Sequence, residues 1–380
     1  MGNGLSFADP QAEQARVTAA AALLRKRLDP RGPADAILII VLAAVYSVTS
    51  AAVVYMLFHR NYPPIRCKSP LLLAAIAVSS MIWFVGDLQS NGHLQLQGTV
   101  FTNCKAFGVW MRNVLGVFLV SGLWAVRAYG VLRVFRSSKP FHGRGMYIPL
   151  GIFLVYLVVY GIVTQLLSAA RTMYYVRPLD ICGLTTKILA VSMVTIWVIW
   201  SCVVVLSWMT RNIKTSFNET RETIFGCIVV FAVLIWANVT MYAAPYYPFS
   251  VRLRVMSTAV DHVATNSYLW LAMAKPVFNC MFRREQYLDR WVATLVEDGL
   301  ELQYDVGYDE QNNITTMYQP STEYLHPKTH PGGAPSCAAT DALTISVVES
   351  STTFTGKVIT WPRLHSARPL PTVPGSAGGP

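Results

Sequence analysis

Residues 36–58 read AILIIVLAAVYSVTSAAVVYMLF and contain no Asp, Glu, Lys or Arg. A helix needs about 20 consecutive apolar residues to cross the hydrocarbon core of a bilayer. Backbone N–H and C=O groups must be paired within lipid, so an apolar run of this length is expected to be helical. The stretch therefore predicts one transmembrane helix.

Six more stretches of this kind follow along the chain. They cover residues 70–88, 105–132, 147–167, 188–208, 223–244 and 255–278. Together with residues 36–58 they predict an all-α membrane protein, a bundle of seven transmembrane helices over residues 36–278. We find no internal repeat and no pair of short, Gly- or Pro-broken helices of the kind that many transporters contain.

The sequence on either side of the predicted bundle differs in character. Residues 1–35 are polar or Ala-rich, and we expect them to form an extracellular N-terminal segment. Over residues 279–300 apolar residues recur at helical spacing with arginines between them, which predicts an amphipathic juxtamembrane helix. Residues 301–380 are acidic at first and then rich in Ser, Thr, Pro and Gly, which is typical of a disordered cytoplasmic tail.

The composition argues against several classes of protein. Of the 380 residues, 53% are hydrophobic and 13% are charged, whereas a soluble domain carries about 25% charged residues. The net charge of +11 lies in short loops and flanks, where cations hold a membrane protein in place, so we expect the lipid bilayer as a partner and no nucleic acid. The sequence contains no HExxH, Walker or nucleophile-elbow motif, so we expect no enzyme, cofactor or metal site.

Cysteines and the N-terminus bear on the orientation, because Lys and Arg divide almost equally between the two sides. Cys104 precedes the third span and Cys182 the fifth, so both fall on the side of the N-terminus. A disulfide between them requires the oxidising face, and two unpaired thiols are the alternative. The start MGNGLS fits N-myristoylation of Gly2, which requires a cytoplasmic N-terminus. We predict the disulfide, in a plasma-membrane protein with its N-terminus outside and its C-terminus in the cytoplasm.

Another lipidation candidate is Cys280, which follows the last span. Cysteines next to a membrane-spanning helix are common sites of palmitoylation. A plain thiol is an equally good interpretation of this residue.

Several polar residues lie inside the predicted spans at similar depth, in the outer third of the bundle. They are Asp87, Arg112, Asn113, Asp261 and His262. Ionisable residues are costly within a membrane, so each of them is a functional hypothesis. An arginine at this depth needs an anion, which Asp87 or Asp261 can provide. Two interpretations stay open: a ligand pocket to which the nearby Trp110 contributes, or an ion pair that only locks helices together.

The predicted inner end of the third span is basic. Arg127, Arg133 and Arg136 alternate there with apolar residues and with Tyr129. Arg127 either extends its charge to the membrane interface, as long side chains near helix ends do, or forms a reversible polar lock with neighbouring helices. These four residues are candidates for coupling to a cytoplasmic partner.

The architecture and two short stretches resemble G-protein-coupled receptors. PPIRCKSPLL at residues 63–72 is similar to the first intracellular loop of glutamate-type and fungal seven-span receptors. FNCMFRREQYLDRW at residues 278–291 is similar to the segment after the last helix in fungal receptors related to those fused to a regulator-of-G-protein-signalling domain. The tail is too low in complexity to hold that domain. The rhodopsin-type Asp-Arg-Tyr, Asn-Pro-x-x-Tyr and Cys-Trp-x-Pro motifs are absent, so a rhodopsin-like activation mechanism does not carry over.

The resemblance implies a fungal receptor that couples an unknown extracellular ligand to a heterotrimeric G protein. The alternative is a seven-span transporter or channel with the same polar residues along its path, which predicts solute flux in vesicles that contain only this protein. A third hypothesis is a membrane scaffold whose tail recruits partners.

Overall fold

The computed structural model describes residues 7–137, 144–210, 219–297, 305–308 and 314–317. All of them belong to one compact unit, Met1–Tyr324, while a second unit, Leu325–Pro380, lies outside the described residues. The disorder that we expect for residues 318–380 therefore also falls outside the described part of the chain.

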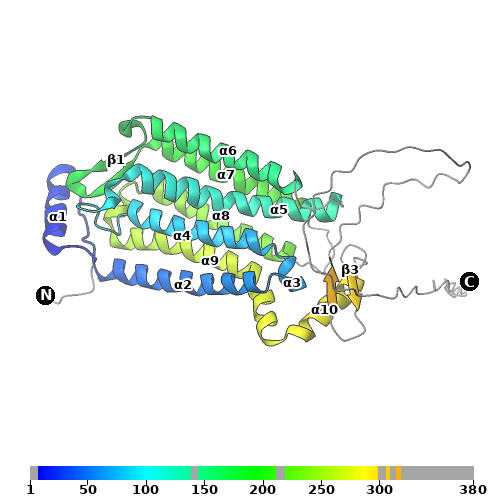
Figure 1. Cartoon of the computed structure of the whole chain (residues 1–380). Coiled ribbons are helices and arrows are strands. Elements are labelled where there is room, and N and C mark those ends of the chain that lie inside the picture. The colour runs from blue at the N-terminus through cyan, green and yellow to red at the C-terminus, as the bar shows by residue number, and fades with distance from the viewer. Residues whose placement is uncertain (1–6, 138–143, 211–218, 298–304, 309–313, 318–380) are drawn as a thin grey trace, which may run out of the picture. The chain divides into compact units, whose positions relative to one another are not determined.

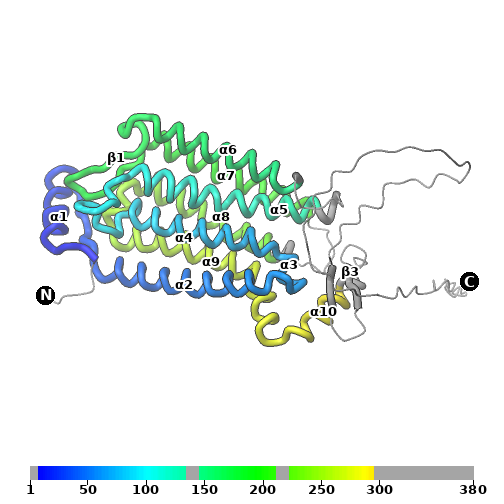
Figure 2. Tube along the Cα trace, viewed as in Figure 1, coloured from blue at the N-terminus to red at the C-terminus, as the bar shows by residue number. Residues whose placement is uncertain are grey.

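Seven long helices run side by side in alternating directions and form the predicted bundle (Figure 1). They are α2 (Pro33–Phe58), α4 (Pro70–Ser90), η2 (Lys105–Phe118) continued by α5 (Leu119–Ser137), α6 (Arg144–Leu166), α7 (Thr186–Met209), α8 (Glu219–Ala243) and α9 (Val251–Phe282). Among the described residues, six of these helices are long and apolar enough to cross a membrane. The seventh, α9, is more polar because it carries Arg254, Asp261 and His262, which are buried inside the bundle. Figure 2 shows that α9 lies beside α2, so the first and last helices close the bundle.

The third helix changes its hydrogen-bonding pattern half-way along. Its first half, η2, is a π-helix, and the backbone leaves helical geometry at Gly116 (φ −93°, ψ −111°) before α5 begins. Glycine lets η2 approach α4 closely, because a Cβ on Gly86 would lie 2.6 Å from the backbone nitrogen of Arg112. π-helical turns are rare and often occur at functional sites. The close approach brings Asp87 on α4 next to Arg112 on η2.

We call the end of the bundle at which α2 begins the N-terminal end. A helix that the sequence analysis did not predict, α1 (Pro10–Leu24), lies there. It begins after Asp9, whose side chain accepts a hydrogen bond from the backbone of Gln11, and it has proline at its first position, as helix starts often do. Ala20 packs in a buried cluster with Leu179 and Phe249, so tertiary contacts hold α1 in place.

The loops at the N-terminal end also contain structure that was not predicted. Between α6 and α7, β1 (Met173–Val176) pairs in antiparallel fashion with β2 (Ile181–Leu184). Short helical turns complete these loops, namely η1 (Val100–Thr102), η3 (Ala169–Arg171), η4 (Arg177–Leu179) and η6 (Tyr247–Phe249). The hairpin and α1 both lie at this end of the bundle (Figure 1).

The opposite end, which we call the C-terminal end, carries the predicted juxtamembrane helix. This is α10 (Arg284–Glu297), which buries Trp291 and Val292 and contacts α9 and the short helix α3 (Pro63–Arg66). Farther along the chain, β3 (Asp305–Tyr308) pairs with β4 (Ile314–Met317). This hairpin occurs inside a segment for which we expected disorder, and its β-branched residues explain the preference for strands.

Candidate functional site

Asp87, Arg112 and His262 meet where α4, η2 and α9 face one another. The Asp87 carboxylate is fully buried, and its Oδ1 forms an ion pair with Arg112 Nε at 2.8 Å. Its Oδ2 accepts a hydrogen bond from Asn91 Nδ2 at 2.8 Å and lies 3.4 Å from His262 Nε2. Because removing a charge from water costs several kcal/mol, a buried ion needs such partners. The structure thus places Asp87, and not Asp261, as the anion that pairs with Arg112.

A chain of hydrogen bonds continues from this cluster towards the N-terminal end. Asn91 Oδ1 accepts hydrogen bonds from Arg112 Nη2 at 3.3 Å and from Tyr247 OH at 2.6 Å. Asn91 Nδ2 also donates to Thr258 Oγ1 at 2.7 Å, which lies 2.9 Å from His93 Nε2. All five side chains are buried, so polar contacts run without interruption through the outer part of the bundle.

This series of hydrogen bonds ends at a bidentate ion pair between Arg254 of α9 and Asp35 of α2. Arg254 Nη2 lies 2.6 Å from Asp35 Oδ2, Arg254 Nε donates to Asp35 Oδ1 at 2.8 Å, and His93 Nδ1 lies 2.7 Å from the same Oδ1. The remaining N–H groups of the guanidinium donate to the carbonyl oxygens of Asp29, Pro30 and Pro248. This pair was not predicted, although opposite charges at the start of the first and seventh helices are a visible signal in the sequence.

A cavity lies next to the charge cluster, between η2, α5, α7, α8 and α9. It contains about 890 Å³ of empty space, including its opening. Arg112, Asn113 and Asp261 line it, whereas Asp87 and His262 are not among its lining residues. Most of its walls are apolar or aromatic, with Trp83, Trp124, Met193, Ile196, Trp200, Leu234 and Tyr268 among them. Sites for small molecules typically combine apolar walls with a few polar groups in this way.

The predicted site residues differ in their partners. Asn113 Nδ2 donates to Ser192 Oγ at 3.4 Å. The side chain of Asp261 is 7% exposed, and its carboxylate has no hydrogen-bond or ion-pair partner among the described residues. Trp110 lies outside the cavity, because its ring packs against Gly161 of α6. The structure therefore separates Trp110 from the other candidates, and it adds aromatic residues that the sequence analysis did not select.

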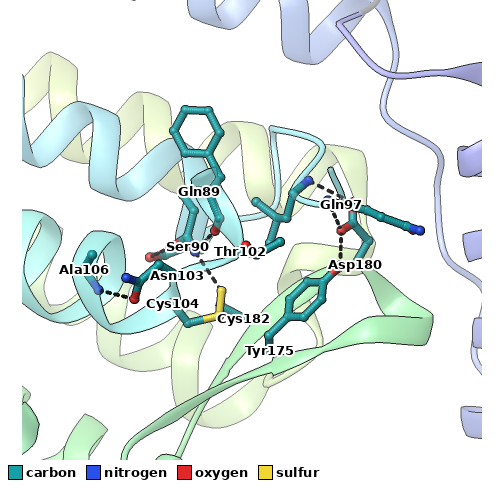
Figure 3. The surroundings of a disulfide bond; sticks show 12 residues. Gln89, Ser90, Gln97, Thr102, Asn103, Cys104, Ala106, Tyr175, Asp180 and Cys182 are labelled. Atoms are coloured by element: carbon teal, nitrogen blue, oxygen red, sulfur yellow. Dashed lines mark hydrogen bonds between the residues drawn. A yellow bond between two sulfur atoms is a disulfide. The ribbon is translucent and has the colours of Figure 1, made fainter. Parts of the chain in front are cut away.

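The predicted disulfide is present and ties the loop between α6 and α7 to the third helix. It joins Cys104, at the start of η2, to Cys182 on β2 (Figure 3). The same strand carries Leu184, which lines the cavity. Gln89 Nε2 donates to Cys182 Sγ at 2.7 Å, so α4 is attached to the hairpin as well. The hairpin is thus a fixed part of the cavity wall.

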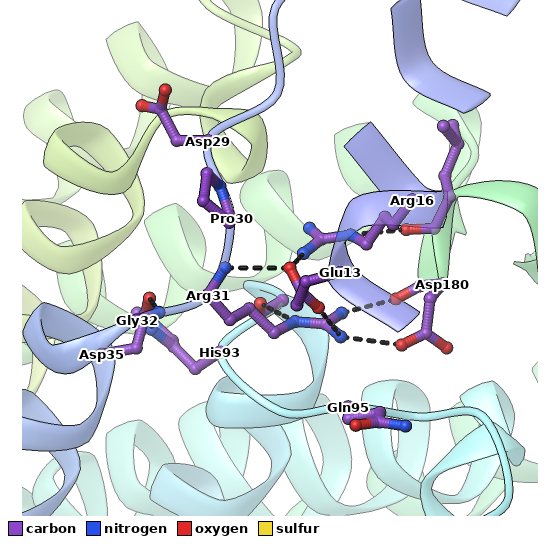
Figure 4. A network of polar contacts seen from close by, with 12 residues as sticks. Glu13, Arg16, Asp29, Pro30, Arg31, Gly32, Asp35, His93, Gln95 and Asp180 are labelled. Carbon is purple, nitrogen blue, oxygen red and sulfur yellow. Dashed lines mark hydrogen bonds and ion pairs between the residues drawn. The ribbon is translucent and has the colours of Figure 1, made fainter. Parts of the chain in front are cut away.

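Buried ion pairs attach α1 to this hairpin (Figure 4). Arg31 Nη1 lies 3.1 Å from Glu13 Oε1 and 2.7 Å from Asp180 Oδ2, and Arg16 Nη1 lies 2.9 Å from Glu13 Oε2. Burial, followed by the positive charge of Arg31, lowers the pKa of Arg16 to about 10. Burial alone would raise the pKa of Asp180, but hydrogen bonds, that from Arg31 foremost, hold this pKa below its ordinary value. The N-terminal segment is therefore part of the fold.

The candidate coupling residues lie on α5. Arg127 is 9% exposed, and its guanidinium lies 5.4 Å from the centre of the Trp124 ring. Arg133 Nη1 donates to Tyr129 OH at 3.2 Å. Arg136 belongs to α5, but its side chain lies outside the described residues. Of the two interpretations of Arg127, its burial favours a polar contact within the bundle.

An ion pair that was not predicted joins two elements at the C-terminal end. Lys68 Nζ, in the loop before α4, lies 3.1 Å from Glu222 Oε2, in the first turn of α8. The two side chains are 14% and 26% exposed. This contact connects the start of the sixth helix to the loop between the first and second helices.

Of the two candidate lipidation sites, the structure describes Cys280 but not Gly2. Cys280 is 4% exposed, and Tyr55 OH donates to its Sγ at 3.7 Å. The thiol is thus packed against α2 and closed to an acyltransferase in this conformation. Gly2 lies outside the described residues.

The comparison with protein families identifies the bundle. Residues 32–274, more than half of the chain, match the family described as "7 transmembrane sweet-taste receptor of 3 GCPR". The matched range covers almost all of the seven helices and both cysteines of the disulfide. No curated protein matches the chain. The fungal subtype stays a prediction. The chain is a multi-pass membrane protein, and it belongs to this family of seven-transmembrane G-protein-coupled receptors.

Proposed function

We propose that this receptor responds to an extracellular ligand in the cavity beside Arg112 and Asp261 and couples it to a heterotrimeric G protein. The observation that carries the proposal is the cavity itself, which has apolar walls and two ionisable groups inside the bundle of a receptor family. No catalytic activity is part of the proposal. A transporter or channel would require a polar path through the bundle, whereas the polar chain from Arg254 to His262 is filled by hydrogen-bonded side chains.

We also propose a plasma-membrane location with the N-terminal end outside the cell. The Cys104–Cys182 disulfide supports this orientation, because disulfides persist on the oxidising face of a membrane. In this orientation the C-terminal end faces the cytoplasm and the G protein. It carries α5, the second half of the third helix, with Arg127, Tyr129, Arg133 and Arg136.

We propose that the signal passes along the third helix. The break at Gly116 lies between Arg112, which lines the cavity, and Arg127, near the C-terminal end. A ligand that changes the position of Arg112 therefore acts on the half of the helix that carries the break. At the C-terminal end of the bundle, the Lys68–Glu222 pair opposes movement of α8. We therefore expect this pair to hold the ligand-free receptor in its inactive conformation.

Reversing the charge of Glu222 is expected to raise ligand-free signalling. A partly exposed ion pair contributes about 0.5–1 kcal/mol, which corresponds to about a 2- to 5-fold change in the active fraction. Glu222→Lys in nanodiscs with a purified heterotrimeric G protein should increase the rate of nucleotide exchange by that factor.

The matched control for this experiment is the double variant Lys68→Glu, Glu222→Lys, which restores opposite charges and should return the rate towards that of the unaltered chain. An exchange rate that is the same with and without the receptor in every variant would contradict G-protein coupling. A normal response with unchanged rates in the variants would show that the pair is no restraint.

Arg112 is expected to act both as an ion-pair partner and as a cavity residue. Arg112→Ala leaves Asp87 buried without its cation, so surface expression should fall severalfold. The double variant Asp87→Asn, Arg112→Gln removes both charges and should restore expression, as measured by labelling of an extracellular tag. If it also restores full nucleotide exchange, the pair only holds helices together; if expression returns without signalling, the pair belongs to the ligand site.

A further inference from the structure

The charges around the cavity do not balance. Arg112 is the cation among the described lining residues, and Asp87 already pairs with it at 2.8 Å. Arg254 is likewise matched by Asp35 at 2.6 Å. Asp261 therefore remains as an acidic side chain with no paired cation among the described residues. Because burial of an unpaired charge is costly, its ionised form needs a cation brought by a ligand.

His262 is the neighbour that could alter this balance. It is not among the lining residues of the cavity, and its Nδ1 lies 2.9 Å from Tyr46 OH while its Nε2 lies nearest Asp87. A neutral imidazole satisfies these contacts, because the tyrosine hydroxyl can donate to Nδ1. The histidine therefore faces Tyr46 and Asp87, and the Asp261 carboxyl group remains for a ligand.

The walls of the cavity limit what the rest of such a ligand can be. Trp124 and Tyr268 form a stacked pair with ring centres 3.9 Å apart, and both rings line the cavity. The serine and threonine hydroxyls that line it already have partners. Ser192 donates to the carbonyl of Ile188, Thr265 donates to the carbonyl of Asp261, and Ser121 Oγ accepts from Trp200 Nε1. Aromatic faces attract cations, whereas few polar groups remain for a sugar or an anion.

We propose that the cavity binds an amphiphilic cation, a ligand with an apolar or aromatic body and one protonated amine that pairs with the Asp261 carboxylate. The inference rests on the proposed receptor function, whose ligand class it specifies. The amine supplies the positive charge that the described lining residues lack, and the aromatic walls cover the body of the ligand. A carboxylate-bearing ligand would add a second uncompensated anion to the cavity and should bind poorly.

Three matched probes test the charge requirement on the purified full-length chain in nanodiscs. They are 4-phenylbutylamine, the neutral 4-phenylbutan-1-ol and the anion 4-phenylbutyrate, with binding measured by calorimetry and by the shift in thermal unfolding. A charge-assisted hydrogen bond in a buried site should make the amine bind at least about tenfold more tightly than the alcohol. The anion should bind more weakly than either.

Asp261→Asn is the decisive variant, because it keeps the shape of the side chain and removes its charge. This variant should bind the amine no more tightly than the alcohol. Its affinity for the alcohol should stay unchanged, and this unchanged affinity shows that the variant is folded. Asp289→Asn makes the same change at an exposed position of α10 and should keep the preference.

The proposal would be overturned by equal binding of amine and alcohol to the unaltered chain, or by a preference for the amine that survives Asp261→Asn. Absence of amine binding up to millimolar concentration would also overturn it. Nucleotide exchange in the Glu222→Lys variant is measured without any ligand, so failure of the amine proposal is distinguishable from failure of G-protein coupling.

Discussion

Replacing Arg254 with alanine is expected to remove most of the protein from the cell surface. The guanidinium is fully buried and forms a bidentate pair with Asp35 and hydrogen bonds to three backbone carbonyls. Among the described residues, truncation leaves His93 as the one ionisable partner of the buried Asp35 carboxylate. Breaking such a pair typically costs about 3–5 kcal/mol, which is a large part of the stability of a protein.

Arg252 provides the matched control for this variant. It lies two residues earlier on α9, is exposed, and loses the same charge when it is replaced. Arg252→Ala should leave surface labelling and the thermal unfolding midpoint unchanged. The double variant Asp35→Leu, Arg254→Met replaces the pair with apolar side chains and should recover much of the lost expression. If Arg254→Ala unfolds at the same temperature as the unaltered chain, the pair does not hold α2 to α9.

Gly86→Ala is expected to separate α4 from the third helix. The added Cβ would lie 2.6 Å from the backbone nitrogen of Arg112 and 2.8 Å from the backbone oxygen of Phe107. Backbone atoms cannot rotate away as a side chain can, so the helices themselves must move. Overpacking of this kind costs about 1–3 kcal/mol, and the movement also lengthens the ion pair between Asp87 and Arg112.

Gly151 on α6 is the control position, because an added Cβ there meets no atom within 4 Å. Gly151→Ala should keep or slightly raise the thermal unfolding midpoint, since alanine favours a helix over glycine by about 1 kcal/mol. Gly86→Ala should lower the midpoint and weaken probe binding in the cavity. Equal midpoints for the two variants would contradict the close helix contact.

The bundle and its central polar residues could be predicted from sequence because the bilayer imposes a simple rule. Apolar runs of sufficient length must become helices, and charges within them need partners, so the seven helices and an ion pair at Arg112 followed from position alone. The disulfide followed from two cysteines on one side of the membrane. Depth along a helix does not specify the direction of a side chain, which is why Asp261 was as good a partner as Asp87 until the helices were placed.

The N-terminal end could not be predicted, because its order comes from contacts between distant segments. The α1 sequence favours a helix because it is Ala-rich, but it is so short that the helix is only marginally stable outside the fold. Its place depends on Arg31, which pairs with both Glu13 of α1 and Asp180 of the hairpin. Trp110 was predicted to line the ligand pocket because of its depth in the membrane. In the structure its ring packs against α6, where Gly161 has no side chain to exclude it.

The contact between Arg31 and Asp180 has a consequence for biosynthesis. The two residues are 149 positions apart, and a ribosome needs roughly 7–30 s to synthesise that length of chain at about 5–20 residues per second. Over that interval the N-terminal segment has been made but lacks its partner, and it must wait on its side of the membrane until the loop before the fifth helix arrives. Docking of the N-terminus therefore follows synthesis of the fourth helix, and it reports that the first four helices have been inserted in the correct order.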